Sequence, residues 1–255
     1  MADTIGGVSG LFDDLAAPAE IRDAVSRLAT DLATAAGENL TGLILYGGLA
    51  RGRYRPGQSD INVVVALRDT STESLSALAT ILRAAWRSIR VEPFIVKTSE
   101  AQRLADVFPT KVLDIQSHQL VLRGDDPFTG TEVSRRQLKL RVEQGLCNLE
   151  LRLRRRYISI FDDPRSLAST LAEAAVPLKI ELAAMLQLAG KDEPSGSTTA
   201  AVLESAAIAF DLNREALSRM AALRRESEPP EDPAGLYDRV IAAISRALEI
   251  VTAME

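Results

Sequence analysis

The sequence predicts an α+β protein, in which a small mixed sheet with flanking helices over residues 19–130 is followed by an all-helical C-terminal bundle over residues 134–255. Two observations support this division. Short apolar runs rich in Val, Leu and Ile, which are typical of strands, occur only in the first half of the chain, where they alternate with helical stripes. Beyond residue 134 the apolar residues recur at the spacing of a helix. A chain of 255 residues is long enough for two modest domains with cores of their own.

Helices and strands are predicted in alternation in the first half. One helical stripe covers residues 19–36, where Gly37 is a suitable C-cap, and another runs from Leu75 to Ile89. The predicted strands are residues 42–46, 61–67, 90–97 and 118–123. Residues 100–117 predict a helix or turn that leads into a short extended segment. A short helical turn is expected around Leu11 to Leu15.

The second half predicts about five helices. The first begins after Ser134 and carries an apolar stripe that ends near Tyr157. The second begins at Pro164, and Pro177 is expected to break or kink it. The remaining helices are predicted at residues 198–210, 214–223 and 236–251.

Four arginines crowd the last turns of the first helix of this bundle, namely Arg152, Arg154, Arg155 and Arg156. They allow two interpretations. We favour a solvated face that also complements the negative end of the helix dipole. The alternative is a patch that faces phosphate groups.

Charge and composition exclude several classes of site. The net charge of −5 makes wholesale nucleic-acid binding an unfavoured function. One cysteine, Cys147, and one histidine, His118, exclude an intramolecular disulfide and a metal site built from cysteines or several histidines. Any metal would therefore be held by oxygen ligands. Because the chain has neither an apolar run of membrane-spanning length nor a secretory signal, we expect a cytoplasmic protein.

The most informative stretch runs from Leu43 to Leu67 and predicts a strand, a glycine-containing turn and a second strand. Gly47 and Gly48 follow the first strand, so backbone N–H groups there can approach a ligand closely. Asp60 and Asn62 open the second strand. Side chains two positions apart on a strand share a face, so these two oxygen ligands could hold one hard cation such as Mg²⁺.

This stretch resembles the signature of the DNA-polymerase-β-type nucleotidyltransferase superfamily, in particular its aminoglycoside and other small-molecule nucleotidyltransferases. The family pattern is an apolar strand, Gly-(Gly or Ser), often Ala-Arg-Gly, and then Asp-x-Asp or Asp-x-Glu at the start of a strand. The chain matches it with Tyr46-Gly47-Gly48-Leu49-Ala50-Arg51-Gly52 and with Ser59-Asp60-Ile61-Asn62. It departs at Asn62, where the family has its second carboxylate. An amide keeps an oxygen ligand there but removes its charge.

The resemblance implies transfer of a nucleoside monophosphate from a nucleoside triphosphate to an acceptor hydroxyl, with Mg²⁺ as cofactor. Gly47 and Gly48 would hold the triphosphate, and Arg51 or Arg53 would neutralise phosphate charge. Asp60 and Asn62 would be the catalytic residues, and they would bind the metal together with Glu92, the third carboxylate, on the following strand. Glu92 could instead be a solvent-facing residue at a strand end. Glu143 and Glu150 are two of many candidates for the general base.

Two further interpretations remain open. The chain could keep the nucleotidyltransferase fold as a catalytically silent module that binds nucleotides or proteins, which the missing charge at Asn62 favours. It could also be a helical protein with an unrelated α/β cap, which predicts no cleft at this site. The acceptor is open among an aminoglycoside, another small molecule, a protein and an RNA end, although the acidic charge disfavours nucleic acid. The oligomeric state is open as well, a homodimer included.

Overall fold

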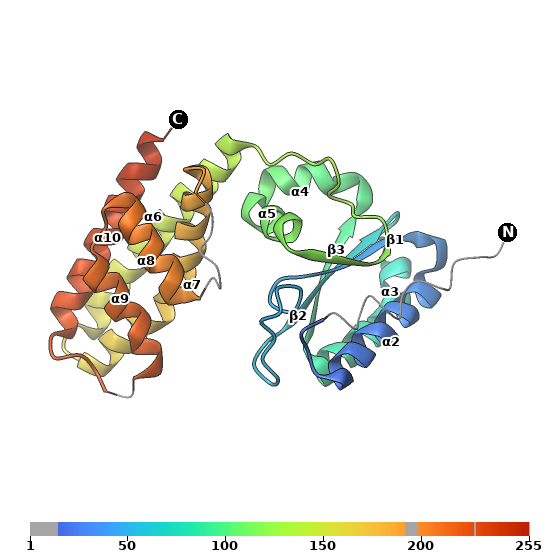
Figure 1. The fold of residues 1–255 in the computed structure, drawn as a ribbon, viewed down its shortest axis with the longest axis horizontal. Helices are drawn as coiled ribbons and strands as arrows, with labels where there is room; N and C mark the ends of the chain where they lie inside the picture. Colours follow the sequence, from blue (N-terminus) through green and yellow to red (C-terminus); the bar gives the residue numbers. More distant parts are fainter. Residues whose placement is uncertain (1–14, 192–197, 227, 255) are drawn as a thin grey trace. The chain divides into compact units, whose positions relative to one another are not determined.

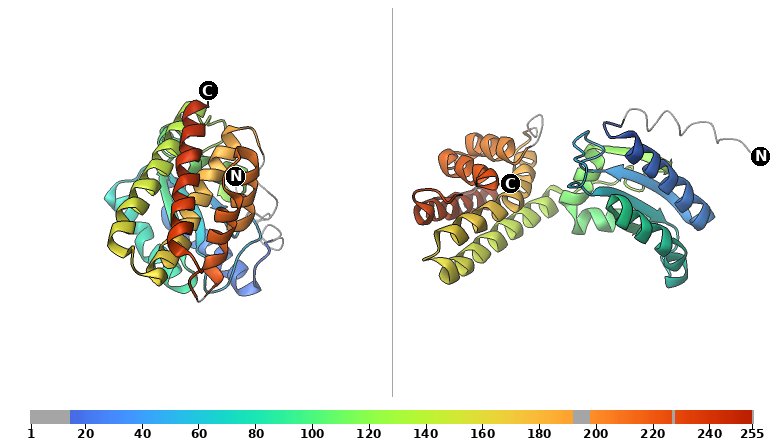
Figure 2. Two further views of the ribbon diagram at one scale, coloured as in Figure 1. Left: turned by 90° about the vertical axis from the view of Figure 1, so that its left-hand side faces the viewer. Right: turned by 90° about the horizontal axis from the view of Figure 1, so that it is seen from below.

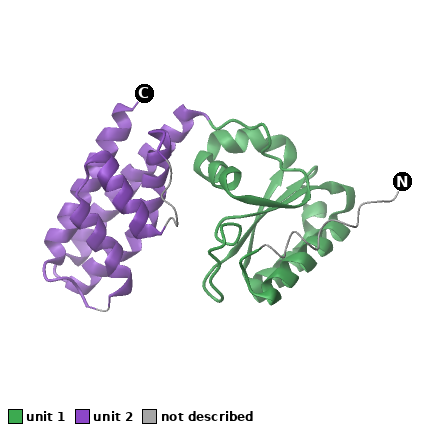
Figure 3. Cartoon of the chain, viewed as in Figure 1, with its two compact units in different colours: residues 1–133 green, residues 134–255 purple. Residues whose placement is uncertain are grey.

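A computed structural model describes residues 15–191, 198–226 and 228–254. The chain divides into two compact units, residues 1–133 and residues 134–255 (Figure 3). We call them the α/β unit and the helical unit. The turn expected around Leu11 to Leu15 lies outside the described residues except for Leu15.

The α/β unit is built on a four-stranded mixed sheet, as predicted (Figure 1). Its strands are β1 (Leu40–Tyr46), β2 (Ile61–Leu67), β3 (Val91–Lys97) and β4 (Gln119–Gly124). Their order in the sheet is β3-β2-β1-β4. Strand β1 is antiparallel to both β2 and β4, whereas β2 and β3 are parallel.

Alternating side chains bury both faces of this sheet. One face packs against α2 (Ala19–Ala36) and α3 (Thr72–Ile89), and the other packs against α4 (Ala101–Val107) and α5 (Pro109–Ser117). On β1, Leu43 and Leu45 belong to the first core and Ile44 and Tyr46 to the second. The strand period of two therefore directs every other residue toward α4 and α5.

The prediction of an extended segment within residues 100–117 is wrong, because α4 and α5 occupy this region. Pro109 occupies the first turn of α5, where the missing N–H of a proline costs nothing. Val112 and Ile115 are both fully buried in the second core. Their spacing of three places them on one helix face, and this local period outweighs the strand preference of β-branched residues.

Helix α3 forms the crossover between the parallel strands β2 and β3. It begins at a cap in which the Ser71 side chain accepts a hydrogen bond from the Ser74 N–H. It ends at Arg90, whose φ of 57° lies in the left-handed region. The chain then enters β3. The Arg90 carbonyl, just before this strand, accepts a 2.9 Å hydrogen bond from the Ile61 N–H.

The helical unit contains α6 (Arg135–Ile160), α7 (Pro164–Leu188), α8 (Thr199–Phe210), α9 (Arg214–Ala222) and α10 (Pro233–Ala253). These five are all the α-helices in the described part of this unit. They lie side by side (Figure 2). Helix α7 continues through Pro177 rather than ending there. No helix in the described ranges is long and apolar enough to span a membrane.

Two buried glutamates link the helices of this unit. Glu150 of α6 accepts hydrogen bonds from Arg154 and from Ser245 of α10. Glu181 of α7 pairs with Arg141 at 3.1 Å and lies against Gly145, where a Cβ would come within 2.2 Å of its carboxylate. Burial raises the pKa of Glu181, and the Arg141 charge offsets part of this effect.

Candidate functional site

The loop after β1 presents three consecutive backbone N–H groups that have no partner among the described residues. The loop is folded on itself by hydrogen bonds from the Arg51 N–H to the Gly47 carbonyl (3.1 Å) and from the Arg53 N–H to the Gly48 carbonyl (2.8 Å). Among the described residues, no acceptor contacts the N–H groups of residues 48–50. Successive N–H groups in a tight turn form a concavity that suits an anion.

Gly47 is required at this turn for two reasons. Its φ of 74° is strained for any residue with a side chain, and an added Cβ would lie 3.0 Å from Nδ2 of Asn62. At Gly48, by contrast, φ is not positive and an added Cβ would meet nothing within 4 Å. The amide of Asn62 is therefore packed against the start of the loop.

A row of polar side chains crosses three strands beside this loop. In the sheet register, Tyr46 of β1 lies opposite Asn62 of β2, and Asn62 lies opposite Glu92 of β3. These residues share the face that carries Ile44, Val64, Phe94 and Val96 and is covered by α4 and α5. The sheet thus brings together Gly47, Asn62 and Glu92, three of the residues singled out in the sequence.

Asp60 is held by an arginine that the sequence analysis did not single out. The Nε and Nη2 groups of Arg90 lie 2.8 and 2.7 Å from Oδ1 of Asp60. The pairing follows from the sheet register, since Arg90 immediately precedes Val91, the partner of Ile61. The two side chains are 39% and 50% exposed, so the pair lies at the surface of the site.

Arg51 is also held by a carboxylate. Its Nη2 lies 2.6 Å from Oδ1 of Asp114 on α5, and only 12% of its side chain is exposed. The Nε of Arg51 is buried and has no hydrogen-bond partner. Arg51 is therefore a fixed part of the site, whereas the Arg53 side chain has no ion pair in the described part of the chain.

The pKa values show that the charges around the row affect one another. Burial raises the pKa of Tyr46 to about 12, and the negative charges of Asp114 and Glu92 add to this effect. Burial lowers the pKa of Lys111, which the same two carboxylates partly counteract. The Lys111 ammonium also lies 4.0 Å from the centre of the Phe94 ring. Asp114 and Lys111 of α5 thus belong to the site.

The site as arranged does not fit an acidic magnesium centre. Its three carboxylates, Asp60, Glu92 and Asp114, are matched by the three cations Arg51, Arg90 and Lys111, and Arg53 of the same loop adds a further positive charge, so the site carries no net negative charge. Within the described residues, no three His, Cys, Asp or Glu side chains gather closely enough to hold a metal ion. Asn62 contributes an oxygen but no charge, and Asp60 already accepts both hydrogen bonds from Arg90.

Of the two glutamates considered as general bases, Glu150 is committed to the helical unit. It is 5% exposed, and its Oε1 accepts hydrogen bonds from both Arg154 and Ser245. Glu143 lies half-buried on α6.

Two residues that sequence reasoning missed are Asp114 and Arg90. Their partners, Arg51 and Asp60, lie 63 and 30 positions away, so no local pattern indicates either pair.

The comparisons with known proteins support the fold. No protein-family model matches the sequence, and no curated protein matches it. A solved structure does match: a crystal structure of spectinomycin adenyltransferase AAD(9) from Enterococcus faecialis with ATP and spectinomycin. It aligns with a TM-score of 0.58 and 13% identity, over 89% of this chain and 98% of that one. At this identity the likeness shows the fold, and the chain is thus similar to a nucleotidyltransferase in fold.

Proposed function

We propose that the protein binds a nucleoside triphosphate at the loop between β1 and β2 and transfers its nucleoside monophosphate to a hydroxyl group of a small-molecule acceptor. The observation that carries this proposal is the placement of three free N–H groups beside the Asn62–Glu92 row, on a fold shared with an adenyltransferase. That adenyltransferase was crystallised with ATP and spectinomycin, which supports a nucleotide and a small molecule as the two substrates.

The chain offers several groups for the phosphates. The N–H groups of residues 48–50 can donate hydrogen bonds to phosphate oxygens. The buried Nε of Arg51, which lacks a protein acceptor, is a further donor, and Asp114 fixes its orientation. Arg53 adds positive charge from the same loop.

In the transfer, the acceptor oxygen forms a bond to the α-phosphorus while the bond to pyrophosphate breaks. The proton of the acceptor hydroxyl must then pass to a base. Glu92 is our candidate, because it is exposed and, within the described residues, is not in an ion pair.

The family resemblance implies Mg²⁺ with Asp60, Asn62 and Glu92 as its ligands, an assignment that the charge-balanced site does not fit and that competes with the role of Glu92 as the base. Because Asp60 is paired with Arg90, binding of the ion by these residues requires that pair to separate. Our proposal therefore does not depend on Mg²⁺ held by these residues, and the effect of Mg²⁺ is tested separately from nucleotide binding.

The proposal is tested by incubating the protein with α-labelled ATP or CTP, with and without Mg²⁺. The acceptors are spectinomycin and a panel of other hydroxylated small molecules. We expect label on one acceptor and an equal amount of released pyrophosphate, both reduced in Glu92→Gln. Absence of transfer with every acceptor would contradict the enzymatic part of the proposal.

Asn62 and the Arg90–Asp60 pair favour a second candidate function, a module that binds nucleotide but does not react. Removal of one charge from a partly dry phosphate site can cost several kcal/mol of transition-state stabilisation. This candidate predicts nucleotide binding without pyrophosphate release in the wild-type protein. It also predicts that the double variant Asn62→Asp/Arg90→Ala gains transfer activity.

A further inference from the structure

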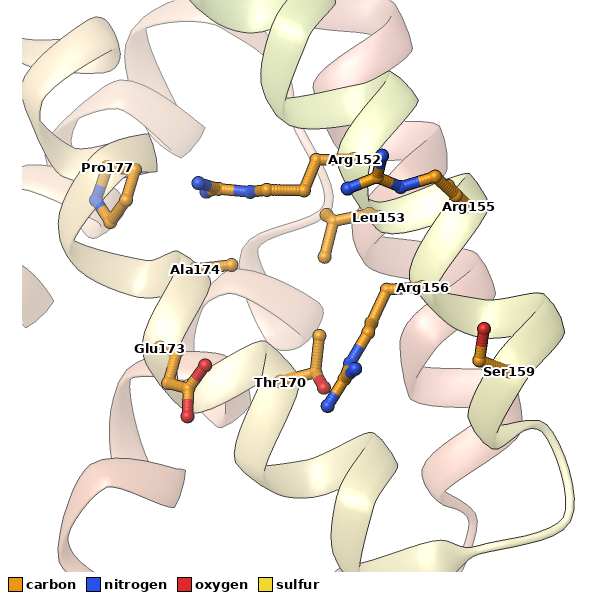
Figure 4. A pocket seen from close by; sticks show the side chains of 9 residues that line it. All are labelled: Arg152, Leu153, Arg155, Arg156, Ser159, Thr170, Glu173, Ala174 and Pro177. Carbon is orange, nitrogen blue, oxygen red and sulfur yellow. The ribbon is translucent and has the colours of Figure 1, made fainter.

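The helical unit contains a pocket of about 410 Å³ between α6 and α7. From α6 its lining includes Arg152, Arg155 and Arg156, and from α7 it includes Thr170, Glu173 and Pro177 (Figure 4). Arg152 extends from α6 toward Pro177, and Arg156 extends toward Thr170. Side chains at positions 152, 155 and 156 share one face of a helix, which explains why all three line the same pocket.

These three arginines differ from the other arginines near them in their lack of a carboxylate partner among the described residues. Within the described residues, none of them takes part in an ion pair. The sequence also gives none of them an acidic residue three or four positions away, whereas Arg154 on another face pairs with Glu150. Arg152 and Arg156 are instead four positions apart and repel each other.

The helix dipole does not account for the cluster. The last turn of α6 contains no basic residue, so the arginines lie one turn too far from its C-terminus to complement the dipole. Arg152, Arg155 and Arg156 are exposed, as expected for the solvated face favoured from the sequence. Their distance from the end of α6 does not support the dipole part of that interpretation, so their charge is open to an anionic ligand.

Pro177 of α7 lies in the opposite wall of the pocket. A proline inside a helix lacks the N–H that would bond to the carbonyl four residues earlier, which here belongs to Glu173. The Glu173 carboxylate is exposed and, in the described part, is not in an ion pair. The α7 side thus offers hydrogen-bond acceptors, whereas the α6 side offers three guanidinium groups.

We propose that this pocket binds a small phosphate monoester that also carries an amino or hydroxyl group. Three positive charges and one negative charge leave a net charge of two on the lining, which matches a phosphate dianion. Guanidinium groups bind phosphate oxygens in paired hydrogen bonds, which favours phosphate over a single carboxylate. The amino or hydroxyl group of the ligand donates to Glu173. This site is independent of the nucleotide site proposed for the α/β unit.

Calorimetry on the full-length chain tests the proposal, with O-phosphoethanolamine and inorganic phosphate as probes at constant ionic strength. We expect Arg152→Gln/Arg156→Gln to weaken phosphoethanolamine binding about tenfold or more. The matched control is Arg136→Gln/Arg225→Gln, which removes two exposed charges of the same unit away from the pocket and should leave binding unchanged. Circular dichroism confirms that each variant is folded.

Glu173→Gln separates the two sources of phosphate. It should weaken the binding of phosphoethanolamine, because the amine of this ligand loses its partner. It should strengthen the binding of inorganic phosphate, because the repulsion by the Glu173 carboxylate is removed. The proposal would be overturned if neither probe bound, or if the control variant lost as much affinity for phosphoethanolamine as Arg152→Gln/Arg156→Gln. It would also be overturned if inorganic phosphate bound as tightly as the monoester, or if a single-stranded oligonucleotide bound more tightly than the monoester through the same arginines. ATP binding by the α/β unit is measured alongside, and we expect it to be the same in Arg152→Gln/Arg156→Gln.

Discussion

Two arginines of the candidate site in the α/β unit are each held by a carboxylate, whereas three arginines of the helical unit have no carboxylate partner among the described residues. Arg51 and Arg90 pair with Asp114 and Asp60 across the fold. Arg152, Arg155 and Arg156 line a pocket and have no such partners in the part of the chain that the structure describes. Paired arginines fix the geometry of a site at little net charge, while unpaired arginines keep their charge for a ligand. From this difference we predict a structural as well as a binding role for Arg51, and a binding role alone for the pocket arginines.

The largest effect on stability is expected for Arg51→Ala. This change leaves the Asp114 carboxylate without its partner and removes a side chain that is only 12% exposed. Because Asp114 remains partly open to water, we expect a loss of about 1–2 kcal/mol in the free energy of unfolding. Urea denaturation measures it, and Arg53→Ala in the same loop is the control that should change stability little.

Tyr237→Phe should lower the free energy of unfolding by about 1 kcal/mol, because the Tyr237 hydroxyl donates a 2.9 Å hydrogen bond to the buried Leu153 carbonyl. Tyr46→Phe should cost much less, because no described acceptor takes a hydrogen bond from the Tyr46 hydroxyl. Equal losses in urea denaturation would show that the two tyrosines are not distinguished by this bond.

The same two tyrosines report the charge around each site. The pKa is raised to about 12 for both, mainly by burial, but acidic neighbours add to the shift at Tyr46 while Arg156 opposes it at Tyr237. A group with a raised pKa stabilises the fold below its ordinary pKa of 10.0 and loses this contribution as the pH rises through about 12. Ultraviolet titration should show that Asp114→Asn lowers the Tyr46 pKa and that Arg156→Gln raises the Tyr237 pKa. Shifts in the opposite directions would contradict the charge assignments.

Arg90→Gly should change stability by less than about 1 kcal/mol. It removes a surface ion pair, which contributes little, and it places glycine at a left-handed position where arginine is strained. Because the change frees Asp60, we expect Mg²⁺ to enhance nucleotide binding more in Arg90→Gly than in the wild-type protein. A Mg²⁺ effect that is identical in both proteins would show that Arg90 does not compete with the cation.

The smallest effect on stability is expected in the helical unit. Arg152→Gln/Arg156→Gln removes one like-charge repulsion, so the unfolding free energy should stay constant or rise by about 0.2–0.5 kcal/mol in the absence of phosphate. A clear loss of stability would mean that these arginines are structural after all. Urea denaturation with and without phosphoethanolamine separates the two cases.

Local patterns predicted most of the fold, and long-range pairs account for what they missed. The valine-rich run at residues 61–67 is the observed strand β2, and the glycine pair marks the observed turn after β1. The helix α5 was missed because four residues of Val112–Ile115 satisfy a strand pattern as well as a helix pattern. The roles of Arg90 and Asp114 could not be predicted from the sequence. Only the register of β2 and β3 and the docking of α5 bring them beside Asp60 and Arg51.

The most direct test of the proposed nucleotide site is calorimetry with ATP and CTP on the wild-type protein, Gly47→Ala and Gly48→Ala, each with and without Mg²⁺. An added Cβ is strained and meets Asn62 at Gly47 but meets nothing at Gly48. We predict that the wild type and Gly48→Ala bind nucleotide, and that Gly47→Ala binds it about tenfold more weakly or not at all while remaining folded. No nucleotide binding by the wild type under either condition, or equal binding by all three proteins, would contradict a nucleotide site at this loop.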